Sequence, residues 1–351
     1  MLQTAAENIV AIIEDYQNDW DIYITPDSVL DWVNQFDNGD RLFILQEMEH
    51  IFQQTYFSKV KCVGLLKKYL PFLTKHHKYT DVHSFLKETI FLNLQREYKS
   101  QSELLMIVDE FLKSDYDFSL SQCGETKIKN FVYIDDVLAT GNKAFFDLSN
   151  WLKEKNQVKL SQTNSEYIIE NKILLSCCFL CIHDWGHSNF LFRLEKEFGL
   201  LLKKQTGSFY HYKIQNNLKA HNPSLNLIYP CEEMCDETIR NYLSTLDATA
   251  NEDRAFRKNI IPRDENFFSS NANRIRLERI FLLKGIEILN SVHNLQVQNI
   301  RPLGYTVKSH KTLGLGTLFF TWRNIPNNCP LVFWWNNNGW MPLFNLRGRG
   351  H

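Results

Sequence analysis

The segment at residues 131–145, FVYIDDVLATGNKAF, constrains the possible folds of this chain more than any other. Its first four residues are β-branched or aromatic, as in a buried strand of a parallel sheet. This apolar run stops at two adjacent aspartates, and from Asn142 onward apolar residues recur at helical spacing. The sequence therefore predicts a buried strand at 131–135, a short turn, and a helix at 142–153.

The turn between this strand and this helix has the composition of a phosphate site. In an open α/β sheet, ligands bind at the carboxyl ends of the strands, where the unpaired N–H groups of a following helix attract anions. Gly141 lets the backbone approach a phosphate closely, and Thr140 offers a hydroxyl. Asp135 and Asp136 can accept hydrogen bonds from two neighbouring hydroxyls. The segment therefore predicts a site for a 5-phosphorylated ribose, and the alternative is a strand that ends in a solvated Asp-Asp turn.

A second strand and helix precede this segment. Residues 90–95, IFLNLQ, have the pattern of another short buried strand, and residues 101–112 have that of an amphipathic helix. A polar stretch at 96–100 separates the two. Because a strand, a helix and a strand in this order form a crossover unit, we expect both strands to lie parallel in one sheet.

Strand and helix patterns alternate through the middle of the chain, which indicates a doubly wound α/β core with a mainly parallel sheet. After the segments already named, the predicted elements are a strand at 171–182, a helix at 188–203, and strands at 210–217 and 225–229. We place this core at residues 86–232.

Residues 1–85 are predicted to form a helical N-terminal extension. Thr25-Pro26 marks the start of a helix at 27–36, because proline is favoured at the first helical position. The other helical patterns of this part lie at 41–55 and 59–73.

Residues 233–351 are predicted to pack on the core as an elaboration of helix and β structure. Their helical patterns end with an apolar stripe at 273–290. Two strand patterns follow, at 313–320 and 331–335, on either side of a turn rich in proline and asparagine. We expect these two strands to form a β-hairpin.

Charge and composition narrow the possible partners. Lysine and arginine number 39 against 40 aspartate and glutamate residues, so no global basic field points to nucleic acid or to an anionic membrane surface. The distribution is uneven, because residues 301–351 contain six lysines or arginines and no acidic residue. A nucleic-acid surface at this basic, aromatic end therefore stays open as an alternative.

The sequence predicts a cytoplasmic protein. The amino terminus lacks a basic leader, and the longest apolar stretch, 173–182, is too short to span a bilayer. Eight cysteines are too few for a disulfide scaffold in a chain of this length and suit a reducing compartment. Cys178, Cys181 and His183 could bind zinc, but an offset of three places the two thiols on opposite faces of a strand. We therefore expect buried free cysteines and no protein metal site.

Residues 135–143, DDVLATGNK, resemble the phosphoribosyl diphosphate (PRPP) signature of type I phosphoribosyltransferases, in which two acidic residues precede Thr-Gly-x-Thr. The resemblance implies that Asp135 and Asp136 hold the ribose 2- and 3-hydroxyls and assist catalysis. It also implies that the 5-phosphate lies in a loop formed by Ala139, Thr140, Gly141, Asn142 and Lys143. Lys143 departs from the pattern, because the family usually has threonine or serine there. A lysine can bind phosphate as a point charge but offers no hydroxyl.

The resemblance implies a diphosphate site as well. In type I enzymes the loop after the first core strand binds the diphosphate, which makes Arg96, Lys99 and Ser100 the candidates in this chain. Cations there would stabilise the charge that builds on the departing diphosphate. Mg²⁺ would be bound mainly through substrate and water, because it keeps much of its hydration shell. The alternative is a solvated surface loop.

Two pairs of residues are candidates for contacts with the base or substrate. His183 and Asp184 follow the predicted strand at 171–182, at its carboxyl end. Asn327 and Asn328 lie between prolines and could hydrogen-bond the edge of a base while a neighbouring aromatic ring stacks on it. The alternatives are solvated loop residues in the first case and ordinary turn residues of a hairpin in the second.

Along nearly its whole length, the chain is similar to one branch of the superfamily, the PRTase-CE proteins of bacterial conflict systems. The features that carry this similarity beside the signature are a helical leader around residues 29–36, the FLNLQ strand with its loop, and the closing GLGTLFF with Trp334-Trp335. The resemblance implies an enzyme that exchanges base and diphosphate at ribose C1, as an effector in an anti-phage system. Two alternatives stay open. One is an inactive sensor of PRPP or a nucleotide that regulates partner proteins, and the other is a nucleic-acid-binding module of a retron-type complex with a reverse transcriptase partner.

Overall fold

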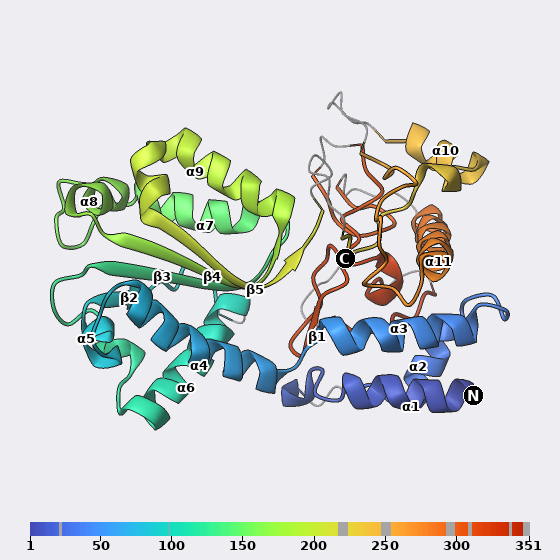
Figure 1. Cartoon of the computed structure of the whole chain (residues 1–351), viewed down its shortest axis with the longest axis horizontal. Helices are drawn as coiled ribbons and strands as arrows, with labels where there is room; N and C mark the ends of the chain where they lie inside the picture. The colour runs from blue at the N-terminus through green and yellow to red at the C-terminus, as the bar shows by residue number, and fades with distance from the viewer. Residues whose placement is uncertain are drawn as a thin grey trace. The chain divides into compact units, whose positions relative to one another are not determined.

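The computed structural model describes residues 1–20, 23–97, 99–216, 224–246, 254–292, 299–307, 311–336 and 339–346. The chain forms two compact units (Figure 1). The sheet unit is Val60–Lys213, and the terminal unit combines Met1–Lys59 with Ile214–His351. This division differs from the predicted boundaries at residues 85 and 232, because residues 60–85 group with the sheet and residues 214–232 group with the two ends of the chain.

A four-stranded sheet with the strand order β2-β3-β4-β5 forms the centre of the sheet unit. β2 pairs with β3, and β3 with β4, in both cases parallel. The predicted α/β fold with parallel strands is therefore confirmed. The strands are β2 (Thr89–Phe91), β3 (Asn130–Leu138), β4 (Leu174–His183) and β5 (Thr206–Ile214).

Helices cover both faces of this sheet. They are α4 (Lys59–His76), α5 (Val82–Lys87), α6 (Ser100–Tyr116), α7 (Asn142–Lys153), α8 (Asn164–Asn171) and α9 (Asp184–Gln205). α7, α8 and α9 lie on one face, and α4 and α6 lie on the other (Figure 1). Alternate residues of β3, such as Phe131 and Tyr133, belong to one buried cluster with Leu148 of α7 and Phe190 of α9. Burial on both faces explains why β3 is apolar from Phe131 to Ile134 and why β4 is apolar up to Ile182 except at Ser176.

β2 is shorter than predicted, because a buried side chain binds the backbone of the residues after it. β2 ends at Phe91, and the amide oxygen of Gln101 accepts from the N–H groups of Leu94 at 2.6 Å and Gln95 at 3.1 Å. Those N–H groups are therefore not available to a sheet ladder.

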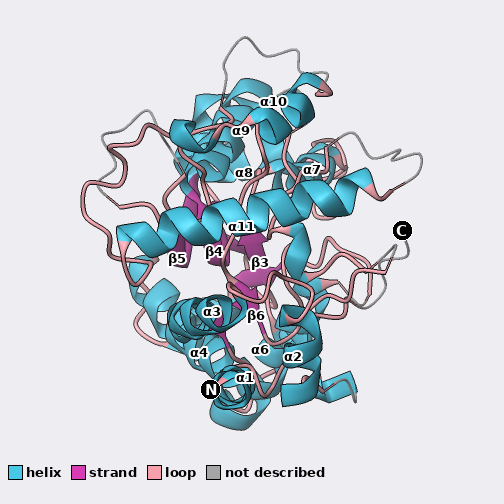
Figure 2. Ribbon diagram, turned by 90° about the vertical axis from the view of Figure 1, so that its right-hand side faces the viewer, coloured by secondary structure: helices cyan, strands magenta, loops and turns pink. Residues whose placement is uncertain are grey.

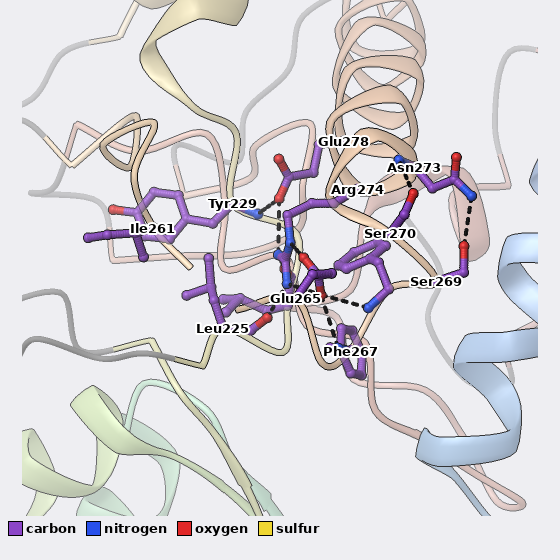
Figure 3. Close-up of polar contacts among 12 residues, drawn as sticks. Leu225, Tyr229, Ile261, Glu265, Phe267, Ser269, Ser270, Asn273, Arg274 and Glu278 are labelled. Carbon is purple, nitrogen blue, oxygen red and sulfur yellow. Dashed lines mark hydrogen bonds and ion pairs between the residues drawn. The ribbon is translucent and has the colours of Figure 1, made fainter. Parts of the chain in front are cut away.

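Residues 225–229 were predicted to be a strand but form none. Arg274 donates to two backbone carbonyl oxygens of this segment, and the Glu278 carboxylate accepts from the N–H of Tyr229 at 3.1 Å (Figure 3). Both side chains come from α11 (Asn271–Asn290) and are fully buried. Buried ionic groups thus bind the backbone positions that a neighbouring strand would have used.

The terminal unit is built from helices and irregular segments, with α3 and α11 as its long helices (Figure 2). α2 starts at Pro26 behind a Thr25 cap, whose hydroxyl accepts from Ser28 N at 3.2 Å, so the predicted start signal is confirmed. In the described part of the chain, no helix is long and apolar enough to cross a membrane. The remaining elements are α1 (Leu2–Ile12), α2 (Pro26–Val33), α3 (Arg41–Thr55), β1 (Tyr56–Phe57), α10 (Glu237–Ser244) and β6 (Phe320–Thr321).

The predicted C-terminal β-hairpin is wrong. β6 pairs parallel with β1 instead, and the second predicted strand is a short 3-10 turn, Leu331–Phe333. The turn buries Leu331, Val332 and Phe333 in succession, and the Phe333 ring stacks on Trp32 with centroids 5.8 Å apart. A strand would have turned every second one of these apolar side chains away from the core. Gly316 has φ +60° and lies directly against the Ile228 backbone. Only glycine allows this close approach, because a Cβ there would lie 1.9 Å from the Ile228 carbonyl oxygen.

Candidate functional site

Both aspartates of the signature lie inside β3, which continues to Leu138 rather than ending at the acidic pair. Asp135 is paired in register with Phe179 of β4. Because successive side chains of a strand point to opposite faces, the two carboxylates point to opposite sides of β3. Asp135 is buried, with 5 % of its surface exposed, and Asp136 is half-buried.

Four donors hold the Asp135 carboxylate. Its Oδ1 accepts from the Ser100 hydroxyl at 2.7 Å and from the N–H of Asp136 at 3.0 Å. Its Oδ2 accepts from the Gln95 amide at 2.9 Å and from the Tyr133 hydroxyl at 3.0 Å. None of these four donors is a cation, so hydrogen bonds alone compensate the buried charge.

Burial is the main cause that raises the pKa of Asp135 to about 6, and the charge of Asp136 adds to the shift. Hydrogen bonds from Ser100, Asp136 and Tyr133 act in the opposite direction. A carboxyl group that titrates near neutral pH suits proton transfer at a reacting centre.

Asp136 faces a different neighbourhood. Its Oδ1 accepts from the N–H of Val137 at 2.6 Å. Burial raises the pKa of the Cys62 thiol in α4, and the charge of Asp136 adds to this shift. The Asp136 carboxylate therefore faces the side of the sheet that α4 covers, whereas the Asp135 carboxylate contacts the segment between β2 and α6.

The predicted phosphate loop connects β3 to α7, which begins at Asn142 as predicted. Gly141 caps this helix with φ +76°, a conformation that favours glycine, and the Thr140 hydroxyl accepts from the N–H of Asn142 at 3.3 Å. Apart from this bond no side chain caps α7, so the N–H groups that follow that of Asn142 are available to an anion.

Residues in the first three turns of α9 contact this loop and support it. A Cβ at Gly186 would lie 1.8 Å from the Ala139 carbonyl oxygen, so only glycine allows this contact. Asn189 donates to the Thr140 carbonyl at 2.9 Å, and Arg193 donates to the Asn142 side chain at 2.6 Å. Sequence reasoning missed these three supporting residues of α9. The spacing of four between Asn189 and Arg193 along the predicted helix at 188–203 would have placed these two on one face, whereas Gly186 lies before that predicted helix.

Lys143, the residue that departs from the signature, pairs with Asp147 one turn further along α7. Its side chain is exposed, whereas the Asp147 side chain is only 11 % exposed. Asp147 also accepts from the Gln95 amide at 3.0 Å, so Gln95 bridges Asp147 and Asp135. Lys143 is thus linked to Asp135 through the Asp147 carboxylate and the Gln95 amide.

The predicted diphosphate residues divide into two groups. Arg96 and Lys99 are exposed in the segment after β2. Ser100 begins α6 and donates to Asp135 instead. Gln101, which is fully buried, anchors the segment by donating to the Ile134 carbonyl at 3.2 Å while it accepts from the backbone of residues 94 and 95.

His183 and Asp184 end β4 and begin α9, as their sequence position predicted. His183 is fully buried, and burial lowers the pKa of its imidazole to about 3, so the ring is neutral. Asp184 is half-buried and forms an ion pair with Lys213 at 3.5 Å. The structure therefore places the imidazole in the interior and the carboxylate at the start of α9.

Asn327 and Asn328 belong to the terminal unit, where they bind its own backbone. Asn328 is 8 % exposed and donates to the Tyr305 carbonyl at 2.8 Å, and the Asn327 carbonyl accepts from Tyr305 N at 2.9 Å. Trp334 and Trp335, the neighbouring aromatics, are buried. The stacking surface that a base or a nucleic acid would need is therefore part of the core in this segment.

The cysteines of β4 lie in the interior. Cys178 and Cys181 are buried on opposite faces of the strand, and all eight cysteines are free. Among the residues that the structure describes, no group of three or more His, Cys, Asp or Glu side chains could hold a metal ion.

Comparison with known proteins identifies the family of this chain. No curated protein and no solved structure matches it. A family model described as PRTase-CE matches residues 29–346, which include the acidic pair, the glycine loop and the turn at Asn327. The chain therefore belongs to the PRTase-CE family.

Proposed function

We propose that this chain binds PRPP, or a related ribose-phosphate, as its Mg²⁺ complex and exchanges a base and diphosphate at ribose C1. The observation that carries the proposal is the arrangement at the end of β3. A buried carboxylate with a pKa of about 6 precedes a glycine loop that opens into the uncapped start of α7. The family, whose name denotes a phosphoribosyltransferase-like protein, supports the same conclusion.

In this proposal the loop binds the 5-phosphate and Asp135 binds the ribose. The N–H groups at the start of α7 donate to phosphate oxygens, and the helix dipole favours the negative charge there. Asn189 and Arg193 keep the loop in shape through the Thr140 carbonyl and the Asn142 side chain. Asp135 accepts from ribose hydroxyls and stabilises the positive charge that develops on the sugar ring as the C1 bond breaks.

Arg96 and Lys99 are the cations that we assign to the diphosphate, because both are exposed in the segment anchored by Gln101. Magnesium enters as part of the substrate and neutralises charge on the leaving diphosphate. The half-buried Asp136 is the carboxylate that could contact a water of the hydrated ion. A site of this kind needs few protein ligands, since substrate and water supply the rest.

A second candidate function is a sensor that binds PRPP or a nucleotide without turnover and regulates partner proteins. The observation that favours it is that Lys143 replaces the usual hydroxyl residue and pairs with Asp147. Incubation of the full chain with Mg²⁺, PRPP and a panel of free nucleobases separates the two functions. Diphosphate release that requires one base, and that is lost in Asp135→Asn, supports the enzyme. Saturable binding without release supports the sensor. If the chain shows no binding and no release, both functions are contradicted.

We extend the proposal to an effector in a bacterial anti-phage system, in the cytoplasm. The resemblance to conflict-system proteins supports the role, and the eight free cysteines support the compartment. A reverse transcriptase with its nucleic acid is the proposed partner. The test is phage challenge of bacteria that carry the intact locus or the Asp135→Asn, Asp136→Asn variant. Equal plaque numbers at equal protein levels would contradict this role.

A further inference from the structure

Asp135 can bind a ribose hydroxyl only if some of its present donors leave. Its carboxylate is buried and already accepts four hydrogen bonds. Two of these donors belong to β3 itself, namely the Tyr133 hydroxyl and the N–H of Asp136. The other two, Gln95 and Ser100, come from the segment between β2 and α6.

Each oxygen of the Asp135 carboxylate accepts from one donor of β3 and from one donor of the segment between β2 and α6. Oδ1 accepts from Asp136 N and from Ser100, and Oδ2 accepts from Tyr133 and from Gln95. The strand donors are fixed, because β3 has β2 on one side and β4 on the other. The two donors from the segment can leave without breaking any hydrogen bond of the sheet ladder.

We infer that two adjacent hydroxyls of the ligand replace Gln95 and Ser100 at Asp135, one hydroxyl on each carboxylate oxygen. The inference rests on the proposed function, which supplies the 2- and 3-hydroxyls of a ribose. It adds that the ligand competes with the protein's own side chains, so its binding releases them from the carboxylate.

The release acts on the cations of the same segment. Gln101 holds the backbone at residues 94 and 95 whether or not Asp135 is bound by Gln95, because these hydrogen bonds involve other atoms. Arg96 and Lys99, whose side chains are exposed, lie between this anchor and α6, and they lose one tie to β3 when Ser100 leaves Asp135. Occupation of the ribose site therefore removes one restraint on these two cations, while Gln101 still donates to the Ile134 carbonyl.

The test is calorimetric titration of the full chain with ribose 5-phosphate. Ser100→Ala and Gln95→Ala each remove one competing donor to a charged acceptor, so each should bind roughly tenfold more tightly than the wild type. Ser102→Ala is the matched control, because its hydroxyl donates to the Arg96 carbonyl at 3.2 Å in the same segment and does not contact Asp135. Its affinity should be unchanged.

A second titration uses 2-deoxyribose 5-phosphate, which has only one hydroxyl of the diol. It should bind the wild type roughly tenfold more weakly than ribose 5-phosphate, because one oxygen of the carboxylate loses a donor without gaining another.

The outcomes separate the inference from the function on which it rests. If the wild type binds ribose 5-phosphate and both variants bind it equally or more weakly, the displacement is refuted and the ribose-phosphate site stands. If Ser102→Ala tightens binding as much as Ser100→Ala does, general loosening of the segment replaces the displacement as the cause. If neither the wild type nor any folded variant binds, the ribose-phosphate site and the displacement are both refuted.

Discussion

Two buried carboxylates in this chain, Glu278 in the terminal unit and Asp135 in the sheet unit, are held in opposite ways. Glu278 lies between two arginines, with Arg257 at 2.8 Å and Arg274 at 3.4 Å. Arg274 pairs in addition with Glu265 (Figure 3). Two cations therefore face two anions. Asp135 accepts only from neutral donors.

The causes of the pKa shifts follow this difference, although the pKa is raised for both Glu278 and Asp135. Burial raises the pKa of Glu278, and the two arginines oppose that shift. For Glu265, burial acts upward as well, but Arg274 and two backbone N–H groups outweigh it and the pKa falls below its ordinary value. For Asp135 no cation opposes burial, and the pKa rises to about 6.

The comparison separates a structural cluster from the candidate site. The arginine–glutamate cluster balances its own charge and binds the backbone at residues 225–229, so its function is to hold the terminal unit together. Asp135 destabilises the folded state at neutral pH, because a buried ionised carboxylate without a cation is unfavourable. Groups that reduce stability in this way are typical of binding and catalytic sites.

The largest expected effect is on the structural cluster. Arg274→Met leaves Glu265 and Glu278 without their shared cation, and we expect a loss of roughly 3–5 kcal/mol in the free energy of unfolding. The control is Arg276→Met on the same helix, whose guanidinium forms an exposed ion pair with Asp40 and should contribute about 1 kcal/mol or less. Urea unfolding of the full chain measures both. Equal losses would show that the cluster is not what holds this unit.

The next effect concerns the pH dependence of stability at Asp135. Its pKa is raised from 3.8 to about 6 in the folded state, so the folded protein binds this proton more tightly than the unfolded chain does. The group therefore stabilises the fold below pH 3.8, and that contribution, about 3 kcal/mol, is lost as the pH rises through about 6. Asp135→Asn is neutral throughout and should lack this decrease.

Unfolding free energies near pH 4 and near pH 7 test this prediction. The variant should gain stability relative to the wild type as the pH increases. The exposed Asp264→Asn serves as the control and should parallel the wild type. A wild type that loses no more stability than Asp135→Asn over this range would mean that the buried carboxylate is not raised in pKa.

Loss of the support that α9 gives to the phosphate loop should lower stability less, but it should also weaken ligand binding. In Gly186→Ala the new methyl group would overlap the Ala139 carbonyl, so we expect a loss of about 1–3 kcal/mol. The affinity for ribose 5-phosphate should fall as the loop is displaced. Gly64→Ala is the control, because a Cβ there meets nothing within 4 Å, and it should stabilise α4 by up to about 1 kcal/mol. Unchanged ribose 5-phosphate affinity in Gly186→Ala would separate α9 from the site.

The smallest expected effect is that of Lys143. Its ion pair with Asp147 is exposed on the lysine side, so Lys143→Met should change stability by no more than about 0.5 kcal/mol. If the lysine turns to the 5-phosphate when a ligand binds, the variant should bind ribose 5-phosphate severalfold more weakly at low salt, and the difference should shrink as salt increases. Identical titrations at both salt concentrations would leave Lys143 with a role in the Asp147 pair alone.

Local patterns predicted the parts of the fold that depend on neighbouring residues. The start of α7 at Asn142 and the Thr25 cap of α2 follow from glycine and proline at fixed positions, and the structure has both. The parallel pairing of β2, β3 and β4 follows from apolar runs separated by helical segments.

Specific side-chain contacts decide the parts that the sequence did not reveal. The end of β2 depends on Gln101, and the missing strand at 225–229 depends on Arg274, which lies more than forty residues further along the chain. The C-terminal strands were predicted from apolar composition, but the burial of Phe333 against Trp32 favours a turn. The donors to Asp135 are serine, glutamine and tyrosine, whose partners no local pattern specifies.

The most direct test of the central claim is calorimetric titration of Mg²⁺–PRPP into the full chain and into the Asp135→Asn, Asp136→Asn variant. The account predicts saturable binding by the wild type that is lost in the variant, while circular dichroism shows that the variant is folded. Binding that persists unchanged in the folded variant, or no binding by the folded wild type, would contradict a ribose-phosphate site at the end of β3.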